Sequence, residues 1–124
     1  MSWAMAERAN QSAHVLMSDG DARGAANRAY YAMFYAARVS LAALEPALVD
    51  SKRHPEIMRR FSKHFVLERG ANPKLGSVFK NAYKLRIDAD YGFAPVDRTR
   101  VERALDSLAS FLSELKSVTT VSTP

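Results

Sequence analysis

The sequence predicts an all-α protein in which four long helices form an up-and-down antiparallel bundle and one short helix is added in a connection. Apolar residues recur at steps of three and four along most of the chain, which is the period of a helix that buries one face. No segment alternates apolar and polar residues as a half-buried strand does. The 124 residues, of which 48% are hydrophobic, suit one compact domain with a single core.

The first two helices are expected on either side of the turn signal Asp19-Gly20-Asp21. The first covers residues 4–17, and the second ends near Pro46. The many alanines of the second helix would let a neighbouring helix approach closely. Its buried stripe comprises Ala26, Tyr30, Met33, Ala37, Leu41 and Leu44.

Residues 46–54 form the main loop in this prediction, and residues 55–66 form the short helix, which is basic. A third long helix begins at Asn72 and Pro73, because Asn caps helices and Pro suits the first helical position. Gly76 weakens this helix by up to about 1 kcal/mol relative to Ala, and packing has to offset that cost. The apolar positions of the third long helix are Leu75, Val78, Phe79, Ala82 and Leu85.

The last helix has the clearest periodicity, and Asp97 is its expected N-cap. Its apolar stripe comprises Val101, Leu105, Leu108, Leu112 and Leu115. A Ser/Thr-rich segment that begins at Ser117 is expected to fray. We therefore expect one domain over residues 1–118 and a frayed tail over residues 119–124.

The composition excludes several kinds of site. The chain has no cysteine, and its three histidines lie far apart in the sequence, so we expect no disulfide, no metal and no cofactor. Charged and polar residues interrupt residues 1–17, so we expect neither a signal peptide nor a membrane span. We therefore expect a cytoplasmic location.

The net charge is +5, and the segment 52–74 alone has seven Lys or Arg against two Glu. This basic patch can contact phosphates, a negatively charged partner, or only water.

Three blocks in order resemble a known family. They are GAANRAYYAMFYAAR at 24–38, FSKHFVLERGANPKLG at 61–76 and AYKLRIDADYG at 82–92. Together they resemble the small prokaryotic branch of the HEPN family (higher eukaryotes and prokaryotes nucleotide-binding), over nearly the whole chain. The resemblance implies a helical bundle that often dimerises and is frequently encoded beside a minimal nucleotidyltransferase, as in toxin–antitoxin modules. Many members are metal-independent ribonucleases.

Active members of that family carry an Arg, four to six further residues and then a His, at the turn between the last two long helices. The Arg stabilises charge on a phosphate and the His transfers a proton. Arg86 matches the arginine, but the histidine is missing, and Asp90 lies one helical turn after Arg86. An ionised Asp can accept a proton but rarely donates one, and it repels a phosphate. An ordinary ion pair at a helix end is the alternative for Arg86 and Asp90.

Tyr91 completes the set of catalytic candidates, Arg86, Asp90 and Tyr91. In related modules the nucleotidyltransferase modifies a tyrosine just after the motif, and Tyr91 corresponds to it by position, although the family's Arg-to-Tyr gap is usually longer. Asn27, Arg28 and Tyr31 form a polar and aromatic strip on the second helix. They could contact a nucleotide or RNA, or they could instead pack in the core or at a dimer interface. In the family fold this helix faces the arginine, so Asn27 and Arg28 are expected to complete its pocket.

The basic short helix adds Arg59, Lys63 and His64 as candidate nucleotide or RNA contacts. Arg59 and His64 also match the Arg–His spacing, but five residues place them 140° apart around a helix, and chance explains the match. The preferred hypothesis is therefore a nucleotide- or RNA-binding, regulatory HEPN protein, which forms a homodimer and pairs with a nucleotidyltransferase-domain protein. The alternatives are a metal-independent endoribonuclease toxin with an altered motif, and a structural oligomeric bundle without a ligand.

Overall fold

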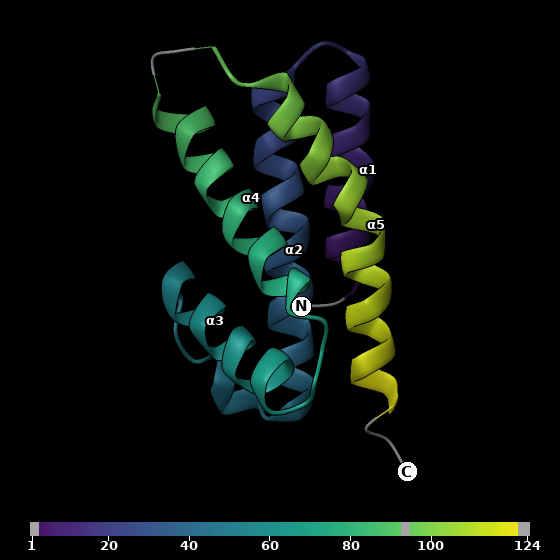
Figure 1. Cartoon of the computed structure of the whole chain (residues 1–124), viewed down its shortest axis with the longest axis vertical. Helices are drawn as coiled ribbons and strands as arrows, with labels where there is room; N and C mark the ends of the chain where they lie inside the picture. Colours follow the sequence, from purple (N-terminus) through teal and green to yellow (C-terminus); the bar gives the residue numbers. More distant parts are fainter. Residues whose placement is uncertain (1–2, 93–94, 122–124) are drawn as a thin grey trace.

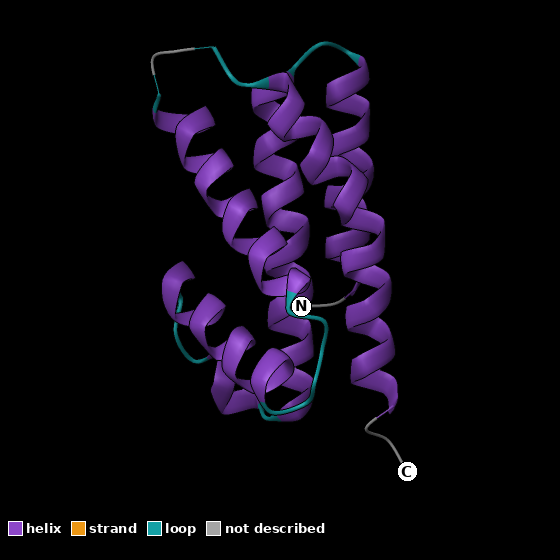
Figure 2. Cartoon of the chain, viewed as in Figure 1, coloured by secondary structure: helices purple, strands orange, loops and turns teal. Residues whose placement is uncertain are grey.

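A computed structural model describes residues 3–92 and 95–121, and in this part of the chain every regular element is helical (Figures 1 and 2). Four long helices form the bundle, which confirms the predicted fold class. They are α1 (Trp3–Ser18), α2 (Ala22–Leu44), α4 (Lys74–Tyr91) and α5 (Arg98–Val121). Between α2 and α4 the chain forms a 3-10 turn (Pro46–Val49), the short helix α3 (His54–Phe61) and a π-helical segment (Ser62–Leu67).

The long helices begin where local sequence signals place them. The Asp21 side chain accepts a hydrogen bond from the Gly24 amide at 2.8 Å and caps α2. The Asn72 side chain accepts from the Lys74 amide at 3.0 Å, and the Asp97 side chain accepts from the Thr99 amide at 3.0 Å. The bonds of Asp21 and Asp97 agree with the predicted starts of α2 and α5, whereas α4 begins at Lys74, with Pro73 rather than Asn72 at the cap position.

Helix α2 lies at the centre of the molecule and packs against each of the other long helices (Figure 1). Its contact with α1 is the most extensive between any two elements of the described chain, and it is built from alanines. The buried residues of α1 are Ala6, Ala9 and Ala13. Because an alanine side chain is a single methyl group, the two helix backbones can come close together along this face.

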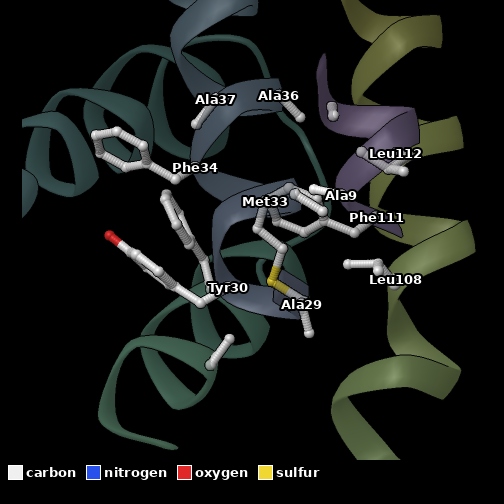
Figure 3. Packing of buried hydrophobic residues seen from close by; sticks show 14 of the residues in the cluster. Ala9, Ala29, Tyr30, Met33, Phe34, Ala36, Ala37, Leu108, Phe111 and Leu112 are labelled. Atoms are coloured by element: carbon white, nitrogen blue, oxygen red, sulfur yellow. The ribbon is translucent and has the colours of Figure 1, made fainter. Parts of the chain in front are cut away.

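The rest of the core is filled by large side chains from α3, α4 and α5. Phe61, Phe79 and Phe111 form a mutual ring cluster with centroid separations of 5.5 to 5.8 Å. Figure 3 shows Leu108, Phe111 and Leu112 on one side of α2, with Tyr30 and Phe34 on the other. The apolar stripe predicted for the last helix is buried at all five positions.

Two boundaries differ from the prediction. The short helix begins at His54 and is followed by a π-helical segment to Leu67. The chain then turns at Gly70, which adopts a positive φ of 70°. Helix α5 continues to Val121, past the expected boundary at 118, and the Thr119 hydroxyl donates to the Leu115 carbonyl at 2.7 Å within that last part. Residues 122–124 of the expected tail lie outside the described residues.

Within the described residues, no helix is both long enough and apolar enough to cross a membrane.

Candidate functional site

Arg86 is held on the surface of α4 that faces α2. Its Nε donates to Asp90 Oδ2 at 3.1 Å, one helical turn away, and its side chain is only 14% exposed. The guanidinium carbon also lies 5.6 Å from the ring centre of Tyr30 and 5.5 Å from that of Tyr31. Cation–π contacts of this kind are stronger where water is excluded. Arg86 therefore forms the ion pair with Asp90 that the sequence analysis gave as the alternative, and two tyrosine rings also shield its guanidinium from water.

Asn27 joins α2 to the same cluster. Its Nδ2 donates to Asp90 Oδ2 at 3.3 Å, so one carboxylate oxygen accepts from both Asn27 and Arg86. The Asn27 Oδ1 accepts from Arg28 Nε and Nη2 at 3.0 and 2.9 Å, and the Arg28 guanidinium lies 5.1 Å from the Tyr31 ring centre. The structure thus brings together Asn27, Arg28, Arg86 and Asp90, as the sequence analysis expected.

A cleft of about 460 Å³ opens beside this cluster and gives solvent access to it. Asn27, Arg28, Asp90 and Arg23 contribute to its lining, and Arg23 donates a hydrogen bond to the Ala89 carbonyl. Arg28 makes no ion pair within the described residues. The carboxylates of Asp21 and Asp90 line the same cleft, so its charged lining comprises two cationic and two anionic side chains.

His54 approaches the cluster from the start of α3. Its Nδ1 lies 2.7 Å from the Tyr30 hydroxyl, and its ring stacks on Phe34 with 4.2 Å between centroids. Burial, then the nearby charges of Arg86 and Arg38, lower the pKa of His54 below its usual value of 6.5. The imidazole is therefore neutral at pH 7, with one ring nitrogen able to accept a proton.

Tyr30 links Arg86 to His54. Its ring is fully buried, it lies against Arg86 on one side and His54 on the other, and burial raises the pKa of its hydroxyl far above the usual range. Tyr30 consequently stays protonated, and its hydroxyl either donates to His54 Nδ1 or accepts from it. We define the Arg86 cluster as Asn27, Arg28, Tyr30, Tyr31, His54, Arg86 and Asp90.

A model of the HEPN domain matches residues 1–118. The chain belongs to the HEPN family. A UPF0332 protein from Gloeobacter violaceus is 35% identical over 89 residues, which cover 72% of this chain and 68% of that protein. A protein from Methanocaldococcus jannaschii that bears the name "Putative toxin" is 27% identical over 112 residues, which cover 90% of this chain and 81% of the relative.

This HEPN chain has no histidine at residues 91–93, where the spacing of the family motif after Arg86 would place one, and the imidazole in the cluster comes from another helix. His54 is 24 residues from Tyr30 in the sequence, so no local motif could reveal their contact. The only available signal was His-Pro at the start of a short helix, which marks a fixed backbone position but no partner. The apolar pattern of the sequence predicted Tyr30 as a core residue alone, although its hydroxyl lies within hydrogen-bonding distance of His54.

The other predicted site residues lie apart from the Arg86 cluster. Tyr91 ends α4 and is 69% exposed. Arg59 pairs with Glu56 at 2.5 Å, and His64 pairs with Glu68 at 2.9 Å. Both contacts are local, within α3 and the π-helical segment, and Lys63 is exposed beside them. The Arg59–His64 match to the motif spacing therefore does not form a second Arg–His site. Within the described residues no group of three metal-ligating side chains occurs.

Proposed function

We propose that this HEPN protein binds the phosphates of a nucleotide or RNA at the Arg86 cluster and acts as a regulatory partner in a two-component module with a nucleotidyltransferase. The observation that carries the proposal is the arrangement of Arg86. One carboxylate and two tyrosine rings hold this guanidinium in place beside a cleft where Arg28 makes no ion pair, so two guanidinium groups are preorganised to share one phosphate. Tyr31 is only partly buried, and its ring lies against the guanidinium groups of both Arg28 and Arg86.

Calorimetry against mononucleotides and short RNAs tests the binding function. Arg86→Ala should weaken binding about tenfold or more, since hydrogen bonds to charged groups contribute about 1.5–3 kcal/mol. Arg103→Ala removes an exposed arginine of α5 and should leave affinity unchanged. If Arg86→Ala binds every ligand as the wild type does and only alters stability, the chain is a structural bundle instead.

The module requires partners, which we propose to be a second copy of this chain and a nucleotidyltransferase-domain protein, acting in the cytoplasm. Exposed Tyr91 supports a modification step, because its phenol is accessible to another enzyme at the end of α4. Incubation with the product of an adjacent nucleotidyltransferase gene and ATP should add the mass of an adenylyl group. The Tyr91→Phe variant should show no such addition, and equal labelling of that variant would place the modification elsewhere.

A metal-independent endoribonuclease is the second candidate, and the position of His54 favours it. If Nδ1–H donates to the Tyr30 oxygen, Nε2 is left to accept the proton of a ribose 2′-hydroxyl. The 2′-oxygen would then attack phosphorus while the bond to the 5′-oxygen breaks. The protonated imidazole or water would give the departing 5′-oxygen its proton, and Arg86 would stabilise the charge on the phosphate. The name of the relative from Methanocaldococcus jannaschii agrees with a toxin of this kind.

RNA cleavage in the presence of EDTA distinguishes the two candidates. A ribonuclease should lose activity in Arg86→Ala and in His54→Gln, whereas His14→Gln changes an exposed histidine of α1 and should retain it. Asp90→Asn removes the carboxylate that pairs with Arg86 but leaves His54 in place, so retained activity in this variant would exclude Asp90 as the proton acceptor. Intact RNA after incubation with folded wild-type protein would leave the binding function as the conclusion.

A further inference from the structure

A second concave surface lies between α3 and α4, away from the cleft beside Asp90. It is a groove of about 390 Å³. Its apolar part is formed by Met58 of α3 and by Phe79 and Tyr83 of α4. Figure 1 shows α3 beside the first half of α4. We call this surface the α3/α4 groove.

Positive charge borders the α3/α4 groove. Lys80 and Lys84 lie one turn apart on α4, and both are exposed lining residues. Among the described residues neither lysine has a carboxylate partner. Arg59 lies on the α3 side and is partly neutralised by Glu56. An occupant of the groove would therefore meet apolar side chains in the middle and unneutralised ammonium groups along one edge.

Gly76 keeps the groove open at one end. A Cβ atom added there would lie 3.6 Å from Ser62 Oγ and 4.0 Å from Val66 Cγ2, which are ordinary contact distances. This chain therefore has room for an alanine at position 76, and alanine favours a helix more strongly than glycine does. The glycine is not required by packing within the chain, so the space that it leaves is available to an occupant of the groove.

The chemistry of the groove selects the class of occupant. Apolar side chains of an occupant have no hydrogen bonds to water that burial in this groove would break. Carboxylates beside them would pair with Lys80 and Lys84. We propose that the α3/α4 groove docks an amphipathic helical segment of a partner protein, with apolar anchors at helical spacing and Glu or Asp facing the lysines.

Selection from a displayed library of 16-residue helical peptides on the full chain tests this proposal. The selected peptides should carry two apolar residues three or four positions apart, with acidic residues one turn away. Fluorescence anisotropy then measures the affinity of one selected peptide. The double variant Lys80→Glu/Lys84→Glu should bind it at least tenfold more weakly, and replacing the acidic residues of the peptide by Lys should restore binding to that variant.

Two further variants separate the effect of the groove's shape on peptide binding from the effect of its charge. Gly76→Leu fills the groove without changing charge and should also weaken peptide binding at least tenfold, while its circular dichroism spectrum stays that of the wild type. Lys52→Glu/Lys74→Glu makes the same charge change at exposed positions outside the groove and should bind as the wild type does.

Several outcomes would overturn the proposal. One is a selection that enriches no acidic peptide, and another is a peptide whose affinity survives both Gly76→Leu and Lys80→Glu/Lys84→Glu. A wild-type dimer that Gly76→Leu converts to a monomer in sedimentation would make a second copy the occupant. A short RNA that binds the wild type but neither groove variant would make a nucleic acid the occupant.

Discussion

His54 shows how burial and neighbouring positive charges lower the pKa of a single side chain. Its ring lies between Phe34 and the Tyr30 hydroxyl, while Arg86 and Arg38 disfavour a second positive charge there. The pKa of His54 is lowered in the folded protein, so between that value and 6.5 the unfolded chain binds more protons than the folded chain. The contribution of His54 to stability is present above 6.5 and is lost as the pH falls.

We therefore predict that the free energy of unfolding of the wild type decreases between pH 7.5 and pH 5.5. His54→Gln has no imidazole to protonate at this position and should show a smaller decrease over the same range. Guanidinium denaturation at the two pH values measures the difference. His14→Gln serves as the control and should behave as the wild type does; an identical pH dependence in His54→Gln would mean that other groups cause it.

Arg86 and Asp90 could be predicted as a pair because their spacing alone puts them on one helix face. The burial of that pair could not be predicted, because it depends on Tyr30 and Tyr31, which belong to another helix and cover the guanidinium. His54 was missed for the same reason. Its partners belong to α2, and contacts between elements leave no periodic signal in a single sequence.

At the scale of an element, the contact between α1 and α2 depends on small side chains. We predict that Ala13→Leu, which adds three carbons at a position with no exposure, destabilises the fold by about 1–3 kcal/mol. The added volume would force the two helices apart. Thermal or chemical denaturation measures this change. Ala43→Leu makes the same substitution at an exposed position of α2 and should leave stability nearly unchanged; equal effects would contradict close packing at Ala13.

The long helices themselves were predictable, because caps such as Asp21 and Asp97 are encoded within four residues of the helix start. The widened segment from Ser62 to Leu67 was predicted as part of an ordinary helix. Its π-helical form is not a local preference of these residues. It accompanies the burial of both Phe61 and Phe65 in the core, which the sequence pattern alone does not require.

For the whole molecule, the net charge of +5 predicts that any RNA binding depends strongly on salt. Each phosphate contact with single-stranded RNA contributes a slope of about 0.7 in a plot of log affinity against log salt concentration. We predict that Arg86→Ala reduces the slope of the wild type by about 0.7, as expected for the loss of one contact. Binding titrations from low to moderate salt give both slopes, and parallel lines would mean that Arg86 does not touch a phosphate.

Tyr30 belongs to the core and to the site at once. Its ring is fully buried beside Phe79, and its hydroxyl meets His54. Any smaller residue at this position would open a hole in the bundle as well as release the imidazole. Only phenylalanine would remove the hydroxyl while keeping the ring. A substitution at this one position would therefore change the stability of the bundle and the environment of His54 together.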